Sequence, residues 1–201
     1  MSDPETLLVY ARKADEYAAR FGANRKSDEP RDTFVALVAP GGRVLDLGCG
    51  PGTSAAALAH AGLSVEAWDA VAEMVALAGQ HAGVTARQAV FGDLNALARY
   101  HGIWANFSLL HAPLADLPEH LAAISAALKP GGIFHIGMKT GEGEARDALG
   151  RRYSYVEPEH LRGLLREAGL KPTLHWTGQS PGLDGVDAPW VIQHAVKPLR
   201  D

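Results

Sequence analysis

The sequence predicts an α/β fold: a mostly parallel sheet with helices on both faces and an antiparallel pair at its C-terminal edge. Two observations support this. Short apolar runs alternate with segments whose apolar residues recur at helical spacing, a pattern typical of a parallel sheet. The last two apolar runs, 170–176 and 190–196, have no helical segment between them, so they are expected to pair antiparallel at one edge.

The elements are expected in the following order. One amphipathic helix covers 6–21 and ends at Gly22, a polar loop covers 24–30, and a second helix covers roughly 31–38. The strands of the parallel part are then expected at 43–47, 64–68, 84–89, 102–108 and 133–138. Helices are expected near 53–61, 71–79, 116–128 and 158–168, with Gly169 ending the last one. A loop rich in Gly, Pro and Asp, 177–189, joins the edge strands.

The stretch 44–53 carries the strongest functional signal. A short apolar run is followed by Asp46 and Leu47. Three glycines then follow at alternate positions, Gly48, Gly50 and Gly52, and a helix-forming run comes next. Strand, glycine loop and helix in this order form the edge at which an α/β sheet receives a nucleotide-like ligand. Glycine lets the ligand approach the backbone and tolerates φ > 0. A dinucleotide fingerprint needs its third glycine one residue later, so the spacing argues against a dinucleotide.

This Asp-x-Gly-x-Gly-x-Gly pattern resembles the first motif of class I S-adenosylmethionine-dependent methyltransferases. Further segments resemble later motifs of that family in the same order. The segment 69–74 resembles its acid-x-Ser-x-x-Met segment, with Val71 in place of serine. The segments 91–94, 103–111 and 128–132 resemble the third motif, the fourth strand with its exit, and the turn into the fifth strand.

The resemblance implies a Rossmann-like, seven-stranded sheet in the order 3-2-1-4-5-7-6, within a single domain over 1–201. It also implies S-adenosyl-L-methionine as cofactor, which leaves as S-adenosyl-L-homocysteine. In the family the acid at Asp69 binds ribose hydroxyls and the acid at Asp93 meets the adenine amino group. The implied cofactor-binding residues are Tyr17, Asp46, Gly48, Cys49, Gly50, Gly52, Asp69, Ala70, Met74, Asp93, Leu94 and Asn106.

Some of these residues also have a plain structural interpretation. Asp46 could cap the following helix, and Met74 could belong to the core of its helix. Asp69 and Asp93, taken singly, could be solvated acids in turns. Cys49 is expected to be a small loop residue rather than a catalytic thiol.

The expected chemistry follows from the cofactor. Its sulfonium already activates the methyl group, so the protein has chiefly to align a nucleophile. The topological switch beside the first strand places the segment 106–111 at the reaction. His111 is the candidate catalytic residue, as proton acceptor or substrate anchor, because an ordinary histidine has a pKa near ~6.5. The alternative is a histidine that hydrogen-bonds within the loop before Pro113.

Two segments are expected to recognise the methyl acceptor. The N-terminal segment 1–38 is a helical cap in which Tyr10 and Tyr17 share one face, unless both only pack the helix onto the sheet. The segment 139–155 is predicted to be a substrate loop, because glycines allow it to move and its side chains suit an anionic or planar acceptor. The alternative is a solvated loop. The candidate substrate-binding residues are Lys139, Arg151 and Tyr153.

Composition is consistent with one domain that has a sizeable core, since the chain has 201 residues. The formal net charge of -4 does not suggest a globally basic nucleic-acid binder. No apolar run approaches the ~20 residues that cross a bilayer, and the N-terminus does not resemble a signal peptide. A single cysteine fits a reducing cytoplasm. The 9 histidines show no pair at metal-ligand spacing, so no metal is expected.

Three functions remain open at this point. The first is methylation of a small molecule, favoured by the short chain, the lack of an added domain and the modest charge. The second is methylation of a macromolecule, such as a tRNA base or a protein side chain, with docking through Lys139, Arg146, Arg151 and Arg152. The third is a protein that binds S-adenosylmethionine without using it. Sulfur, nitrogen, oxygen and carbon nucleophiles are all compatible with the motifs.

Overall fold

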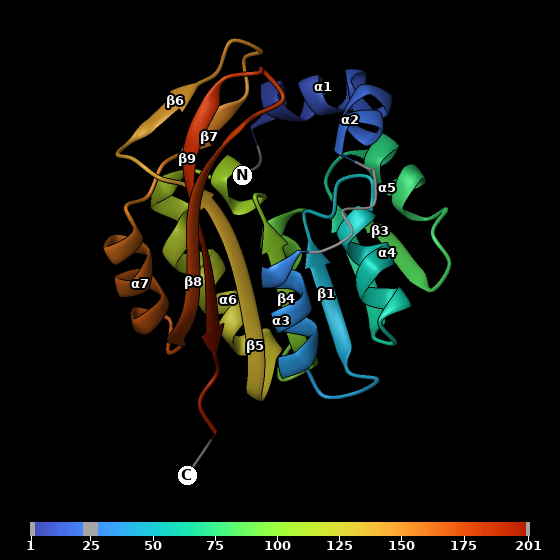
Figure 1. Cartoon of the computed structure of the whole chain (residues 1–201), viewed down its shortest axis with the longest axis vertical. Coiled ribbons are helices and arrows are strands. Elements are labelled where there is room, and N and C mark those ends of the chain that lie inside the picture. Colours follow the sequence, from blue (N-terminus) through green and yellow to red (C-terminus); the bar gives the residue numbers. More distant parts are fainter. Residues whose placement is uncertain (1–2, 22–27, 200–201) are drawn as a thin grey trace.

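The computed structural model describes residues 3–21 and 28–199, and it confirms the predicted fold class (Figure 1). The large sheet has the order β3-β2-β1-β4-β5-β9-β8. Strands β3, β2, β1, β4 and β5 pair in parallel, and β9 runs antiparallel to both of its neighbours. Counted along the large sheet alone, this is the order 3-2-1-4-5-7-6 that the family resemblance implies.

The strands of the large sheet are β1 (Arg43–Leu47), β2 (Ser64–Asp69), β3 (Val84–Gln88), β4 (Tyr100–Asn106), β5 (Leu128–Lys139), β8 (Lys171–Pro181) and β9 (Asp187–Val196). A small separate hairpin consists of β6 (Glu144–Arg146) and β7 (Arg152–Ser154). The α-helices are α1 (Pro4–Arg12), α2 (Ala14–Phe21), α3 (Glu29–Leu37), α4 (Thr53–His60), α5 (Ala72–Ala78), α6 (Leu117–Ala127) and α7 (Pro158–Glu167). Short 3-10 turns cover Phe91–Asp93, Leu109–His111 and Leu114–Asp116.

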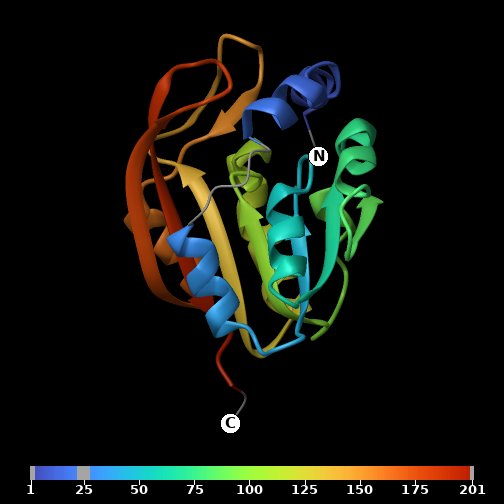
Figure 2. The same cartoon turned by 45° about the vertical axis from the view of Figure 1, so that its right-hand side comes forward.

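The core lies in two layers, one on each face of the sheet. On one face, apolar residues of α3 and α4 such as Phe34 and Leu58 pack with Val44 and Trp104 of the sheet. On the other face, α6 and α7 pack on a second set of strand residues that includes Phe134. Figure 2 shows α3 and α4 together in front of the sheet. The central strands β1, β4 and β5 are therefore mostly buried, whereas β3 at the edge of the sheet is partly exposed.

The N-terminal segment differs from the single helix expected over 6–21. It forms α1 and α2, which meet at Lys13 and lie across the carboxyl ends of the strands (Figures 1 and 2). Asp3 begins α1, because its side chain accepts a hydrogen bond from the Thr6 N–H at 2.9 Å. Tyr10 on α1 and Tyr17 on α2 therefore do not share the face of one helix, but their rings still meet edge to face with centroids 5.6 Å apart. The expected helix end at Gly22 and most of the loop 24–30 lie outside the described residues.

Two predicted loops are shorter or more ordered than expected. The segment 139–155 contains the β6–β7 hairpin rather than an open loop. Its order comes from α1, since Arg146 pairs with Asp3 at 2.8 Å and the Arg152 N–H donates to Thr6 Oγ1 at 2.8 Å. The edge strands β8 and β9 extend into the expected loop 177–189 and leave only a turn between Pro181 and Asp187. Tertiary pairing that no local pattern encodes explains both differences.

Candidate active site

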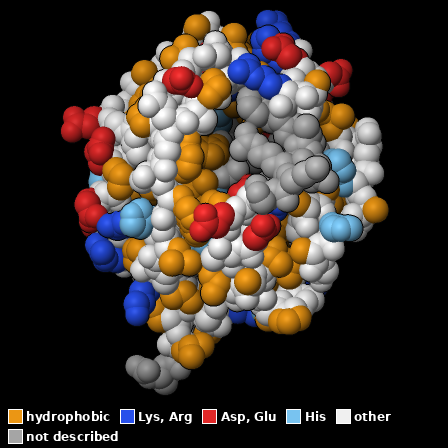
Figure 3. Space-filling view, viewed as in Figure 1, with side chains coloured by type: hydrophobic (Ala, Val, Ile, Leu, Met, Phe, Trp, Pro, Cys, Tyr) orange, Lys and Arg blue, Asp and Glu red, His pale blue; other side chains and the backbone are white. Residues whose placement is uncertain are grey.

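A cavity of about 710 Å³ lies at the carboxyl ends of β1, β2, β4 and β5, beneath α1 and α2. The turn between β8 and β9 forms another part of its wall, and α2 contacts this turn through a hydrogen bond from Arg20 to the Leu183 carbonyl at 2.8 Å. Figure 3 shows this face of the molecule hollowed, with hydrophobic side chains along the wall. The volume is typical of a ligand site, for which the usual range is about 300–1,000 Å³.

The three glycines of the loop after β1 all have positive φ: 77° at Gly48, 53° at Gly50 and 83° at Gly52. A side chain at Gly48 would collide with Ser108, whose Cβ would lie 2.3 Å from the added Cβ. One at Gly52 would collide with Ala78 of α5 at 2.7 Å. At Gly50 the nearest atom would belong to Tyr17, 3.8 Å away. Gly50 is therefore the glycine whose bare backbone borders open space in the cavity, whereas Gly52 is required for packing and does not line it.

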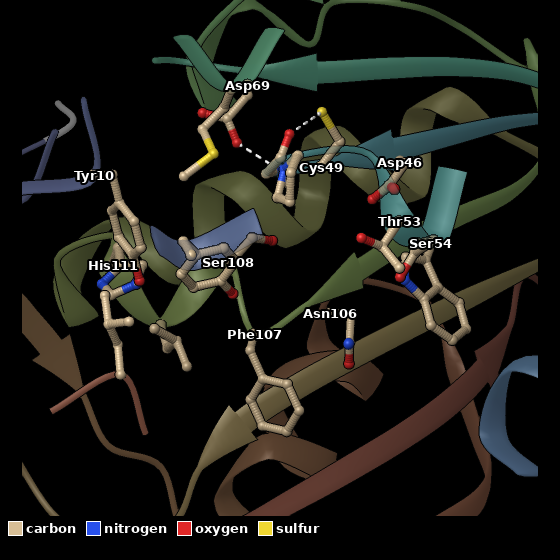
Figure 4. Close-up of a pocket in the computed structure, with 18 of the residues that line it drawn as sticks. Tyr10, Asp46, Cys49, Thr53, Ser54, Asp69, Asn106, Phe107, Ser108 and His111 are labelled. Carbon is tan, nitrogen blue, oxygen red and sulfur yellow. Dashed lines mark hydrogen bonds between the residues drawn. The ribbon is translucent and has the colours of Figure 1, made fainter. Parts of the chain in front are cut away.

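Asp69 holds the glycine loop from the end of β2. Its Oδ2 accepts the N–H of Gly50 at 2.8 Å (Figure 4). Its Oδ1 accepts the N–H of Val71 at 2.9 Å. Burial raises the pKa of this carboxyl. Each carboxylate oxygen has a further lone pair, so Asp69 can accept hydroxyl groups of a ligand as well. Ala70 and Met74 line the cavity beside it, although Met74 also packs against α1 and α2 as a core residue.

A row of buried polar side chains crosses the sheet below the cavity. Asp46, Trp104, His135 and His194 are aligned on β1, β4, β5 and β9 by the strand register. The indole of Trp104 stacks on the His135 ring with centroids 3.4 Å apart. Three buried side-chain atoms have no hydrogen-bond partner among the described residues, and all three belong to this row: Asp46 Oδ2, Trp104 Nε1 and His194 Nδ1.

Asp46 is the member of this row that lies next to the glycine loop. Burial, and then the charge of Asp69, raise the pKa of Asp46 to about 8. A buried carboxyl with an unpartnered oxygen favours a ligand that carries a positive charge or a hydrogen-bond donor. This fits the amino-acid end of S-adenosylmethionine, which carries an ammonium group. The row and the open backbone at Gly50 thus suit the cofactor that the sequence motifs imply.

Asn106 faces the cavity at the end of β4 and is held from below by the same row. His135 Nε2 lies 3.1 Å from Asn106 Oδ1, and His135 Nδ1 lies 2.9 Å from His194 Nε2. Burial lowers the pKa of both histidines, that of His194 to about 4. The two rings are therefore neutral at pH 7, and one of them fixes the orientation of the Asn106 amide. Since the two histidines are 59 residues apart, only strand register brings them together.

His111 is fully engaged by hydrogen bonds. Its Nδ1 lies 2.7 Å from the carbonyl oxygen of Arg152, which can only accept, so Nδ1 carries the proton. Its Nε2 then accepts the hydroxyl of Tyr10 at 2.8 Å. Burial lowers the pKa of His111 to about 4, which keeps the ring neutral. In Figure 4, Tyr10 and His111 lie at one end of the cavity and Asp46 at the other.

The candidate substrate residues differ in how their charges are balanced. Arg151 is buried and pairs with Asp147 at 2.6 Å, while its Nη1 donates to the Tyr10 hydroxyl at 2.8 Å. Tyr153 is buried against the His111 ring, with centroids 4.8 Å apart. Lys139 is half-buried, and its Nζ lies 3.9 Å from the centroid of the Tyr153 ring.

Two of the expected cofactor residues do not reach the cavity by their side chains. Asp93 turns back on its own backbone, where its Oδ2 accepts the Val90 N–H at 2.9 Å. Leu94 is buried in the core. Val90 and Phe91 line the cavity in their place, because the 3-10 turn directs the segment before Asp93 inward. Cys49 lines the cavity, and burial raises the pKa of its thiol, which does not suit a nucleophilic thiolate.

The structure thus brings most of the expected residues to one cavity. They are Tyr17, Asp46, Gly48, Cys49, Gly50, Asp69, Ala70, Met74, Asn106, His111, Lys139, Arg151 and Tyr153. Gly52, Asp93 and Leu94 lie outside it. Sequence reasoning missed the lining residues Arg31, Trp104, His135, Leu183 and Trp190. No local pattern identifies these, because they come from distant segments that meet only in the folded chain.

Comparison with known proteins relates the chain to methyltransferases. A family model described as a methyltransferase domain matches residues 44–132. The ubiquinone biosynthesis O-methyltransferase of Xanthomonas campestris is 30% identical over 162 residues, which is 70% of this chain and 67% of that protein. A trans-aconitate 2-methyltransferase of Mycobacterium ulcerans is 29% identical across 100% of this chain and 80% of its own length. The chain spans about two thirds of the length of the O-methyltransferase relatives, 65% in Cereibacter sphaeroides.

Solved structures share the fold. The 1,6-didemethyltoxoflavin N1-methyltransferase of Burkholderia thailandensis has a TM-score of 0.70 at 22% identity and covers 98% of this chain and 92% of its own. The [4+2]-cyclase SpnF has a TM-score of 0.72 at 18% identity, covering 100% and 98%. The chain belongs to the class I S-adenosylmethionine-dependent methyltransferases, as its motifs predict. Its cofactor is S-adenosyl-L-methionine.

No helix among residues 3–21 and 28–199 is long and apolar enough to cross a membrane. Within the same residues, no group of three or more His, Cys, Asp or Glu side chains is placed to hold a metal ion.

Proposed function

We propose that this protein transfers the methyl group of S-adenosyl-L-methionine to a small-molecule acceptor. One observation carries the proposal: a single continuous cavity joins the glycine loop after β1 to side chains of β4, β5 and the β8–β9 turn. A cofactor on the first part would present its methyl to a molecule on the second. The names of the relatives support a small acceptor, since they are methyltransferases of ubiquinone biosynthesis and of trans-aconitate.

In this proposal the part of the cavity at β1 and β2 holds the cofactor, and different residues there bind its different groups. Asp69 binds the ribose hydroxyls, Val90 and Phe91 border the adenine, and Asp46 with the Gly50 backbone receives the amino-acid end. The bound cofactor supplies an activated methyl group on a sulfonium. The protein residues orient the two reactants and exclude water, which is the main catalytic demand of such a transfer.

His111 is proposed as the proton acceptor, acting through Tyr10. Because the Tyr10 hydroxyl occupies His111 Nε2, a proton from the acceptor would pass to Tyr10 as Tyr10 passes its own proton to His111. Arg151 donates to the same hydroxyl and steadies it. A hydroxyl or amine acceptor needs this step, whereas a thiolate acceptor does not.

The proposed docking patch for a macromolecule finds less support. Arg146 pairs with Asp3 and Glu5, Arg151 with Asp147, and Arg152 with Glu144. Ion pairs within the protein neutralise three of the four cations that such a patch needs. We further propose a cytoplasmic location, which is consistent with the buried, unpaired Cys49.

The proposal is tested by incubating the protein with S-adenosylmethionine labelled in the methyl group and a small-molecule metabolite extract. A parallel reaction contains RNA, with an RNase-treated portion as its control. We expect labelled product from the small-molecule extract and none from RNA. Calorimetry with S-adenosylhomocysteine and with NADH provides the binding control. Binding of NADH in place of S-adenosylhomocysteine, or label in RNA alone, would contradict the proposal.

A further inference from the structure

Lys139 is a half-buried cation without an anionic partner. It ends β5 on the wall of the cavity, and its Nζ lies over the Tyr153 ring. Among the described residues, no carboxylate lies within ion-pair distance of this Nζ. Asp147 pairs with Arg151, and Asp184, whose Oδ1 accepts the Val186 N–H at 3.2 Å, acts on Lys139 by its charge without pairing with it. Within the described part of the chain, the Lys139 ammonium group lies over the Tyr153 ring and forms neither an ion pair nor a hydrogen bond.

The other cations on the cavity wall differ from Lys139 in this respect. Arg151 forms a buried pair with Asp147, and Arg31 lies 3.5 Å from Asp32. Arg20 donates to the Leu183 carbonyl. Arginine side chains that are already bound lose those contacts when they turn to a ligand. Lys139 can accept an anion without breaking an ion pair.

Aromatic rings flank this cation on the acceptor side. Trp190 is its register partner on β9, and the Phe107 and Trp190 rings meet edge to face with centroids 6.3 Å apart. Phe107 has a φ of 54°, rare for a bulky residue, and its N–H donates to the Gly137 carbonyl at 3.1 Å. This unusual conformation directs the Phe107 ring at the wall of the cavity. The walls near Lys139 therefore suit a small molecule with a flat apolar part.

The turn between β8 and β9 passes directly over the ammonium group. A Cβ at Gly182 would lie 2.8 Å from Asp184 Oδ1 and 3.6 Å from Lys139 Nζ, so this turn brings the Asp184 carboxylate near the cation without forming an ion pair with it. Partial burial of an unpaired ammonium group costs free energy, and burial accordingly lowers the pKa of Lys139. A bound anion removes this cost, because it replaces the water that the cation has lost.

We infer that the methyl acceptor carries an anionic group, a carboxylate or a phosphate, which binds the ammonium group of Lys139. The inference rests on the proposed transfer of a methyl group to a small molecule. The anion is assigned to the acceptor rather than to the cofactor because of where Lys139 lies in the sheet. Asp69 lies on β2 and the glycine loop follows β1, whereas β4 separates β1 from the β5 strand that ends in Lys139.

The test separates a metabolite extract on an anion exchanger into a retained, anionic fraction and an unretained fraction. Each fraction is incubated with labelled S-adenosylmethionine and the wild type, Lys139→Met, Lys139→Arg or Lys171→Met. Lys171→Met is the matched control, because Lys171 is an exposed lysine at the start of β8 and does not line the cavity. Phosphatase treatment of the retained fraction distinguishes a phosphate from a carboxylate. Calorimetry measures the affinity of each variant for S-adenosylhomocysteine.

We expect label in the retained fraction and at least about a tenfold loss of kcat/KM in Lys139→Met, with most of the activity kept in Lys139→Arg and Lys171→Met. The affinity for S-adenosylhomocysteine should not change. Label confined to the unretained fraction, or wild-type kcat/KM in Lys139→Met, would overturn the inference and leave the proposed function intact. A loss of S-adenosylhomocysteine affinity that accounts for the whole effect would assign Lys139 to the cofactor instead. If neither fraction is labelled, the proposed function itself fails, and the inference with it.

Discussion

Gly50 forms part of the cavity wall with its backbone alone. Replacing it with Val is expected to abolish binding of S-adenosylhomocysteine while the protein still folds, because the branched Cβ would enter the cavity and resist the φ of 53°. Calorimetry and circular dichroism measure the two effects. Gly62→Val is the control, since Gly62 has a φ of 88° with nothing within 4 Å of an added Cβ and lies outside the cavity. Normal binding by the Gly50 variant would remove it from the site.

Asp69 and Asp93 are the two acids that the motifs assign to the cofactor, and only Asp69 lines the cavity. Asp69→Ala is expected to weaken binding of S-adenosylhomocysteine by about 1–3 kcal/mol, because it removes a ligand and releases the Gly50 N–H. Asp93→Ala should weaken this binding far less, since the Asp93 carboxylate accepts a hydrogen bond from the Val90 N–H instead of facing the cavity. Calorimetry on both variants decides the matter. Equal losses would show that Asp93 contacts the cofactor in the bound state.

His111 carries the proposed proton transfer. Replacing it with Ala is expected to lower the turnover of a hydroxyl or amine acceptor by about 100-fold and to leave a thiolate acceptor nearly unaffected. Burial lowers the pKa of His111 to about 4, so the ring stays neutral, and able to accept a proton, well below its ordinary value of 6.5. The acid limb of kcat should therefore fall near pH 4 to 5 rather than 6.5. If the acid limb of kcat lies near pH 6.5 and disappears in His111→Ala, the His111 imidazole is exposed to solvent instead.

At the scale of elements, α1 and the β6–β7 hairpin form one cover over the cavity, joined through Tyr10, Arg151 and Asp147. Arg151→Ala is expected to destabilise the protein by about 3–5 kcal/mol, because it leaves the buried Asp147 carboxylate unpaired. Arg146→Ala, which breaks exposed ion pairs with Asp3 and Glu5, should cost about 1 kcal/mol or less. Urea unfolding measures both. If both substitutions lower the free energy of unfolding by similarly small amounts, the ion pair of Arg151 with Asp147 is open to solvent.

The same elements show what a sequence can reveal. The bounds of β1 agree with the expected 43–47, because a strand buried on both faces appears as one continuous apolar run. The hairpin inside 139–155 escaped prediction, since its order depends on Asp3 and Thr6, more than a hundred residues away. The glycine loop was recognisable because its chemistry is local. The His135–His194 pair was not, because only the register of β5 with β9 creates it.

At the scale of the whole molecule, the buried row of Asp46, Trp104, His135 and His194 runs from the cofactor end of the cavity to β9, the strand next to the edge of the sheet. Its ionisable members are kept uncharged by burial, the carboxyl by a raised pKa and the histidines by lowered pKa values. A charge on any of them would have to be balanced within the core. The polar atoms of the row can therefore bind a ligand, and because its side chains are uncharged they can be buried in the core.

This neutrality predicts how stability depends on pH. Unfolded Asp46 ionises near its ordinary pKa of 3.8, whereas burial holds the folded value at about 8. The folded state therefore binds more protons between these values, and stability falls as the pH rises through that window. The buried histidines change the stability with pH only below pH 6.5, because their pKa values in the folded state lie below the ordinary value of 6.5.

We therefore expect the melting temperature of the ligand-free protein to fall between pH 6.5 and 8, and Asp46→Asn to reduce this fall. Asparagine has the same shape and does not ionise, so the comparison isolates the carboxyl. Any remaining slope is attributed to Asp69, whose pKa burial also raises, and Asp69→Asn measures that share. Parallel melting curves for the wild type and Asp46→Asn would show that the Asp46 carboxylate is already ionised and solvated in the folded protein.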